Sequence, residues 1–109
     1  MFVAMNRFQV LPGKNEEFER IWRERETYLD GVPGFLRFAL LRNDGGHGTE
    51  PNPGEYLSHS TWASREAFMA WTNSESFRKG HAQGSLMGIL AGPPVVSLYE
   101  AVLEQEARP

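Results

Sequence analysis

The chain has 109 residues, of which 40% are hydrophobic and 12% aromatic, enough for one globular domain with a two-layer core. Its formal net charge of −3, from 11 basic and 14 acidic residues without a basic cluster, argues against nucleic acid as a partner. The chain contains no cysteine, which excludes disulfides, thiolate metal sites and a cysteine nucleophile, so any redox chemistry requires a bound group.

No segment has the pattern of a membrane span or an export signal. The N-terminal residues MFVAMNRFQV lack a basic region and a long apolar run, and no apolar stretch reaches the roughly 18 residues that a membrane helix needs. We therefore expect a cytoplasmic protein without a membrane partner.

The first half of the chain predicts a strand, a helix and two further strands. Strand formers at 2–11 end at the Pro12-Gly13 turn, and Asn15 is the expected N-cap of a helix over 15–29. The charged run EEFERIWRERE in this helix is expected to be mostly a solvated face, opposite an apolar face made by Phe18, Ile21, Trp22 and Leu29. Strands are then expected over 35–42 and 55–62, joined by the glycine- and proline-rich loop 44–54.

The second half predicts two helical segments and a last strand. Ser64 is expected to cap a helix that carries Ala67, Phe68 and Trp71 on one face and is interrupted at 72–74. A short helix over 75–81 places Phe77 and His81 on one side, and a loop of small residues over 82–94 leads to a strand over 95–103. We expect one domain over 1–103 and a C-terminal tail over 104–109.

This order predicts an α+β fold of the ferredoxin-like βαββαβ type, with an antiparallel sheet and two helices on one of its faces. Val3 and Met5 alternate with Phe2 and Ala4, so the first strand is apolar on both faces, and the strand over 95–103 shows the same pattern. Because two helices cover only one face, we expect a homodimer in which two sheets pack together as a dimeric α/β barrel.

Asn6 is a single amide in the apolar row formed by Phe2, Ala4, Phe8 and Val10. An unpaired buried amide costs about 1–3 kcal/mol, so Asn6 requires a hydrogen-bond partner. That partner is either a carbonyl of the protein or a ligand in a cleft between the sheet and the helices.

His81 and Trp71 are open to the same two interpretations. His81 is either a structural residue at a helix end or a metal ligand, and it precedes a loop with Gly84, Gly88 and Gly92 that leaves room for a bulky guest. Neutral imidazole is a common ligand of haem iron where thiolate is absent. Trp71 is either a core residue or a flat wall for such a guest.

Other candidates have weaker support. His47 lies in the 44–54 loop, His59 lies on a strand, and neither has metal-ligand spacing to His81. Arg78 and Lys79 are surface charges that could attract carboxylates at the mouth of a cleft. Phosphate-binding loops and a nucleophile elbow are absent from the sequence.

With Asn6, Trp71 and His81 taken together, the chain resembles the antibiotic biosynthesis monooxygenase (ABM) superfamily, and within it the IsdG-type haem-degrading monooxygenases. The resemblance spans about residues 2 to 102 and is most specific in PGFLRFALLR, TWASREAFMAW and SESFRKGH. The long 44–54 loop and the glycine-rich segment after His81 depart from the family pattern.

The resemblance implies that haem lies between the sheet and the second helical region, with His81 as the iron ligand. It implies that Asn6 hydrogen-bonds the dioxygen-derived ligand and that Trp71 buckles the porphyrin, in a pocket that also includes Phe68, Phe77 and Arg78. Haem would be both cofactor and substrate: reduced iron binds dioxygen, the ring is hydroxylated and opened, and iron leaves. Such a reaction needs an external electron donor, and the implied partner is a reductase.

Two alternatives remain open at this stage. One is an ABM monooxygenase that oxidises a small aromatic or quinol-like substrate without a cofactor, with Trp71 and Phe68 as stacking walls and His81 as general base. The other is a non-catalytic dimeric domain for haem binding or protein interaction, in which Asn6 and His81 bond only within the protein.

Overall fold

The computed structural model describes residues 1–81 and 86–109, and it contains four strands and three helices. In chain order these are β1 (Phe2–Gln9), α1 (Asn15–Glu24), β2 (Phe35–Arg42), β3 (Glu55–Trp62), α2 (Arg65–Thr72), α3 (Glu75–His81) and β4 (Val95–Glu100). Part of the predicted 82–94 loop, with Gly84, lies outside the described residues.

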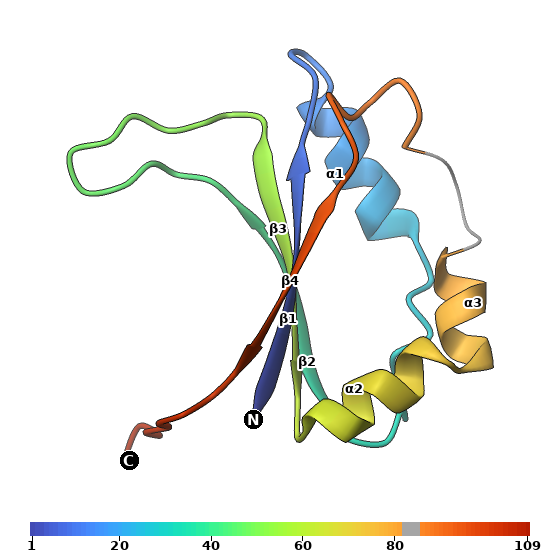
Figure 1. The fold of residues 1–109 in the computed structure, drawn as a ribbon. Coiled ribbons are helices and arrows are strands. Elements are labelled where there is room, and N and C mark those ends of the chain that lie inside the picture. The colour runs from blue at the N-terminus through green and yellow to red at the C-terminus, as the bar shows by residue number, and fades with distance from the viewer. Residues whose placement is uncertain (82–85) are drawn as a thin grey trace.

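The strands form one antiparallel sheet in the order β2-β3-β1-β4, and all three helices lie on one side of it (Figure 1). This arrangement confirms the predicted ferredoxin-like α+β fold. β1 and β3 are the central strands, so Asn6 on β1 lies in the middle of the sheet.

The helix-covered face of the sheet carries two separate hydrophobic clusters. Phe2 and Ala4 belong to a cluster with Leu29, Trp62 and Phe68, whereas Phe8 and Val10 belong to a second cluster with Phe18, Tyr56 and Ile89. Asn6 lies between them on the same face of β1, opposite Ser58 of β3 and Val96 of β4. The apolar row predicted on β1 is therefore confirmed, and its amide marks the boundary between the two clusters.

Helix α1 is shorter than predicted, ending at Glu24 rather than at residue 29. Arg25 has extended backbone angles, and Tyr28 has a φ of 56°, with its amide donating to the Glu26 side chain at 3.3 Å. Leu29 is still buried, as the periodicity predicted, but it enters the core from this non-helical segment. The hydrogen bond between the Tyr28 amide and the Glu26 side chain, together with the packing of Leu29, stabilises this segment in place of a last helical turn.

Three other boundaries differ from the prediction. Lys14, not Asn15, is the N-cap of α1, because the Asn15 amide instead donates to the Pro53 carbonyl and to the Tyr56 hydroxyl, where it ties α1 to β3. The last strand ends at Glu100 rather than at residue 103, and Val102 and Leu103 are exposed beyond the sheet. β1 ends at Gln9 rather than at residue 11, because Val10 forms only an isolated bridge with Leu90 beyond the sheet, whereas β2, β3 and α3 have the predicted bounds.

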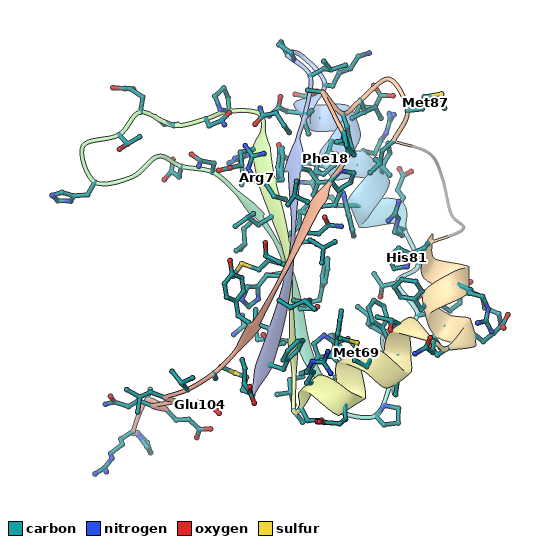
Figure 2. All side chains as sticks on the ribbon, viewed as in Figure 1. Arg7, Phe18, Met69, His81, Met87 and Glu104 are labelled. Atoms are coloured by element: carbon teal, nitrogen blue, oxygen red, sulfur yellow. The ribbon has the colours of Figure 1, made fainter. Side chains whose placement is uncertain are left out.

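Within the described residues, no helix covers the other face of the sheet. In Figure 2, Arg7 and Phe18 lie on opposite sides of β1, with Phe18 between the sheet and α1. The uncovered face includes exposed apolar side chains, among them Val95 and Tyr99 of β4 and Leu41 of β2. The loop after β2 and the C-terminal tail both extend toward this side (Figure 1). The division into a domain over 1–103 and a tail over 104–109 stays a prediction.

No helix in the described residues is long and apolar enough to cross a membrane.

Candidate active site

A cavity of about 380 Å³ lies between the two hydrophobic clusters, within the range of about 300–1,000 Å³ that is common for small-molecule sites. Its floor is the helix-covered face of the sheet, around Asn6, Ser58 and Phe38. Its walls come from the end of α1, from α2 and from α3. Three helices thus meet over the one polar position of the β1 row.

Asn6 lines this cavity without an internal partner for its carboxamide oxygen. Oδ1 is buried and accepts no hydrogen bond from the residues that the structure describes. One interpretation of Asn6 is that a protein group satisfies it. The described residues provide no such partner for Oδ1. A neutral amide held on a cavity wall with unused hydrogen-bonding capacity is suited to contact a guest.

His81 reaches the cavity from the last turn of α3 (Figure 2). Its Nδ1 lies 2.9 Å from the backbone oxygen of Phe77, and because a carbonyl can only accept, Nδ1 carries the proton of this hydrogen bond. In the neutral ring Nε2 then has a free lone pair. Metal-binding histidines commonly donate their other ring N–H to a carbonyl in this way, so Nε2 is available to ligate a metal.

Two aromatic rings lie against the exposed His81 and form one side of the cavity. The Phe77 ring stacks on the imidazole with 4.0 Å between centroids, and Trp71 lies 5.9 Å from it. Trp71 also contacts Phe68 and the fully buried Trp62, at 6.0 and 5.1 Å. Its indole nitrogen is buried without a partner in the described part of the chain. Trp71 is thus both a core residue and a flat wall of the cavity.

Arg78 is the one predicted pocket residue that the structure does not bring to the cavity. Its guanidinium faces solvent and pairs with Glu75 at 2.6 Å, one turn away on α3. His47, in the projecting loop, and His59, on the uncovered face beside Met5, do not line the cavity. Asn6, Phe68, Trp71, Phe77 and His81 all line it.

Trp22 and Arg25 of the α1 region line the cavity, and sequence reasoning missed both as site residues. Trp22 stacks on Phe38 with 5.7 Å between centroids, and the Arg25 guanidinium lies 4.5 Å above the indole. Burial lowers the pKa of Arg25. The available signal was spacing, because Phe18, Trp22 and Arg25 follow one another at helical intervals and so share a face.

A second, more open cavity of about 610 Å³ adjoins the first. Asn6, Trp22, Arg25 and His81 line both, and the outer part is bordered by residues of the segment before β4, from Leu86 to Pro94. The two spaces together give a large, mostly apolar site with a few polar groups. One imidazole nitrogen, a wall of aromatic rings and an uncommitted amide fit haem, whose iron takes a histidine and whose porphyrin packs on flat apolar surfaces.

The fold and this site define an α+β protein of the ferredoxin-like class with a cavity between the sheet and the helices. Residues 1–83 match the family model described as antibiotic biosynthesis monooxygenase, and the chain belongs to this family.

Known relatives are similar over nearly the whole chain. A haem oxygenase (mycobilin-producing), from two Mycobacterium tuberculosis strains, CDC 1551 / Oshkosh and H37Rv, is 32% identical over 104 residues, which cover 94% of this chain and 90% of the relative. The structure of the haem degrader MhuD from M. tuberculosis, with two haems in its active site, is similar with a TM-score of 0.72 and 29% identity, covering 97% of this chain and 100% of that one.

A cofactor-independent oxygenase is a more distant neighbour. SnoaB from Streptomyces nogalater, in the form of an asparagine-to-alanine variant, has a TM-score of 0.66 and 22% identity, with 94% of each chain covered. At that identity the similarity shows a shared fold alone.

Proposed function

We propose that the protein is a haem-degrading monooxygenase that uses dioxygen and an external electron donor to open the porphyrin ring and release iron. The observation that carries the proposal is the hydrogen bond from His81 Nδ1 to the Phe77 carbonyl, which leaves Nε2 available at a cavity lined with aromatic rings. The 32% identity to a mycobilin-producing haem oxygenase supports it.

Each site residue has a role in this proposal. His81 would hold the iron through Nε2, and Trp71, Phe68 and Phe77 would contact the porphyrin. Asn6 would offer a neutral amide, whose Nδ2 can donate to a bound oxygen ligand and whose Oδ1, an acceptor, has no partner among the described residues. Haem supplies iron that activates dioxygen once reduced, and is itself consumed as the substrate. The protein supplies binding, orientation and exclusion of water.

Titration with haemin tests this proposal. We expect a Soret band that saturates at a defined stoichiometry, is lost or strongly shifted in His81→Ala and is unchanged in His47→Ala, whose histidine lies in the exposed loop. With catalase and a reductant under air, the band should bleach and iron should appear in a ferrozine assay. Binding without bleaching would leave a haem-binding module. Oxygen uptake with a quinol, and no response to haemin, would favour a cofactor-independent oxygenase.

We further propose that the protein is a homodimer. The face without helices exposes Tyr99 at 55%, Val95 at 56% and Leu41 at 44%, a set of apolar side chains that a second copy would cover. Analytical ultracentrifugation should give a dimer for the wild-type chain and for Arg65→Glu on the helix side, and a monomer for Tyr99→Glu. A monomeric wild-type chain at micromolar concentration would refute the dimer.

Two parts of the proposal concern the cell. A separate reductase would supply the electrons, and the protein would be located in the cytoplasm. Bleaching of bound haem by a purified flavin or ferredoxin reductase with NADPH, at a rate dependent on reductase concentration, tests the first. Cell fractionation tests the second, with enrichment in the membrane or exported fraction as the opposing result.

A further inference from the structure

Gly80, in the last turn of α3, touches the backbone of a segment that follows α1. A Cβ atom built on Gly80 would lie 2.9 Å from the carbonyl oxygen of Thr27 and 3.6 Å from its carbonyl carbon. Gly80 is buried and is not among the glycines with positive φ, so its backbone conformation is open to any residue. Glycine is therefore needed here because a side chain would collide with Thr27, and not because of the backbone conformation.

The Thr27 carbonyl is available for this contact because α1 ends early. If the helix continued to residue 29, the backbone at Thr27 would belong to its last turns. Instead Arg25 is extended and Tyr28 is left-handed, with a φ of 56°. Thr27 and Gly80 both line the first cavity. The contact therefore joins the wall made by the α1 region to the wall made by α3.

His81 directly follows Gly80, and its other restraints lie within the α2–α3 unit. Nδ1 bonds to the Phe77 carbonyl on α3, the Phe77 ring stacks on the imidazole, and Trp71 of α2 lies 5.9 Å away. These contacts orient the ring on its helix. The position of the helix end relative to the opposite wall, with Trp22 and Arg25, depends on how closely Gly80 approaches Thr27.

We propose that Gly80 is a positioning residue: the contact of its bare backbone with the Thr27 carbonyl fixes His81 at the distance from the α1 wall that iron ligation requires. This inference rests on the proposed haem function. Any side chain at residue 80 pushes the last turn of α3 away from Thr27 and shifts the imidazole, since the neighbouring atoms are backbone and yield little.

Gly80→Ala tests the inference, because helix propensity alone and the proposed contact predict opposite changes in melting temperature. Alanine is a better helix former than glycine, so without the Thr27 contact the substitution would raise the melting temperature. We expect instead a melting temperature lower by a few degrees and haemin affinity weaker by about tenfold or more. Ser76→Ala, which also introduces alanine into α3 but away from the cavity walls, is the control: it should leave haemin affinity unchanged and should not lower the melting temperature.

Spectroscopy separates a displaced ligand from a collapsed cavity. In ferrous haem-loaded Gly80→Ala, the iron–histidine stretching band in the resonance Raman spectrum should shift or disappear, and added imidazole should restore a histidine-type spectrum. The double variant Thr27→Gly/Gly80→Ala gives residue 27 freedom to yield and should recover part of the affinity. It also provides a second variant in case Gly80→Ala folds poorly.

Two results would overturn the inference: an unchanged or higher melting temperature with unchanged haemin affinity in Gly80→Ala, or a double variant that recovers nothing. Failure of the underlying function has a different signature. If the wild-type chain does not bind haemin, the proposed function falls, whereas the placement of His81 is still measurable without haem. The imidazole chemical shifts of His81 in NMR spectra should then change in Gly80→Ala and stay constant in Ser76→Ala.

Discussion

Replacing Asn6 by leucine should make the protein more stable and less active. Leucine has nearly the shape of asparagine, and the Asn6 oxygen is buried with no partner among the described residues. A buried polar group without a hydrogen bond costs about 1–3 kcal/mol, and the leucine side chain removes that cost. A net gain of about 1 kcal/mol raises the melting temperature of a small domain by roughly 4–8 °C. If Asn6 were instead a satisfied core amide, the same substitution would lower it.

The loss of activity has a separate origin in the same side chain. A preorganised hydrogen bond to the reacting group is typically worth about 2.7–4 kcal/mol, or roughly 10²–10³ in turnover. We expect haem bleaching in Asn6→Leu to slow by about that factor, while haemin affinity changes little because His81 and the aromatic walls remain. Thermal melts, haemin titration and single-turnover bleaching measure the three quantities, with Ser97→Ala on the uncovered face as the control. A variant that is less stable and fully active would refute the reasoning.

Two further predictions concern stability. The Tyr56 hydroxyl donates to the Glu19 carboxylate at 2.6 Å and, with Arg42, lowers the pKa of Glu19 from its ordinary 4.5, so this stabilisation is complete above pH 4.5 and is lost as the pH falls through the lowered pKa. Melts between about pH 6 and pH 3 should show a smaller acid-induced drop in Glu19→Gln, and equal drops in both proteins would contradict this. Gly34 has a φ of 80° and its Cβ would collide with that of Ala67, so Gly34→Ala should cost about 2–4 kcal/mol in denaturant unfolding. Gly48→Ala, at a φ of 75° with open space around it, should lose only the smaller free energy that comes from backbone strain. Equal losses in the two variants would show that the collision with Ala67 contributes nothing.

The fold was predictable because its signals are local. Alternation of side chains placed Asn6 and its apolar neighbours on one face of β1, and turn residues separated β2 from β3 at the observed bounds. The end of α1 was not predictable in the same way. Leu29 continues the helical spacing, but its burial depends on packing against Phe2 and Trp62, which are distant in sequence. Tertiary contacts overrode the local pattern there.

The site was predictable only in part. Asn6, Trp71 and His81 stood out as polar or aromatic residues in unusual settings, and the structure places all three on one cavity. Arg25 did not, because it belongs to a charged run in which most residues face solvent. Gly80 was hidden for another reason: its neighbour is a backbone carbonyl on a segment expected to be helical. Contacts between segments far apart in the chain leave no local trace.

The cavity itself leads to a last prediction, that haemin stabilises the protein strongly. The oxygen of Asn6 and the indole nitrogens of Trp22 and Trp71 are all buried without partners in the described residues, and they come from three elements that line one space. Each such group costs about 1–3 kcal/mol in a domain whose total stability is on the order of 5–15 kcal/mol. A guest that binds only the folded chain stabilises it by about 2.7 kcal/mol at 100 times its Kd, which is roughly 10–20 °C in melting temperature. Calorimetry with haemin should show such a shift for the wild-type chain and a much smaller one for His81→Ala, and an equal shift in both would show that haemin binds elsewhere.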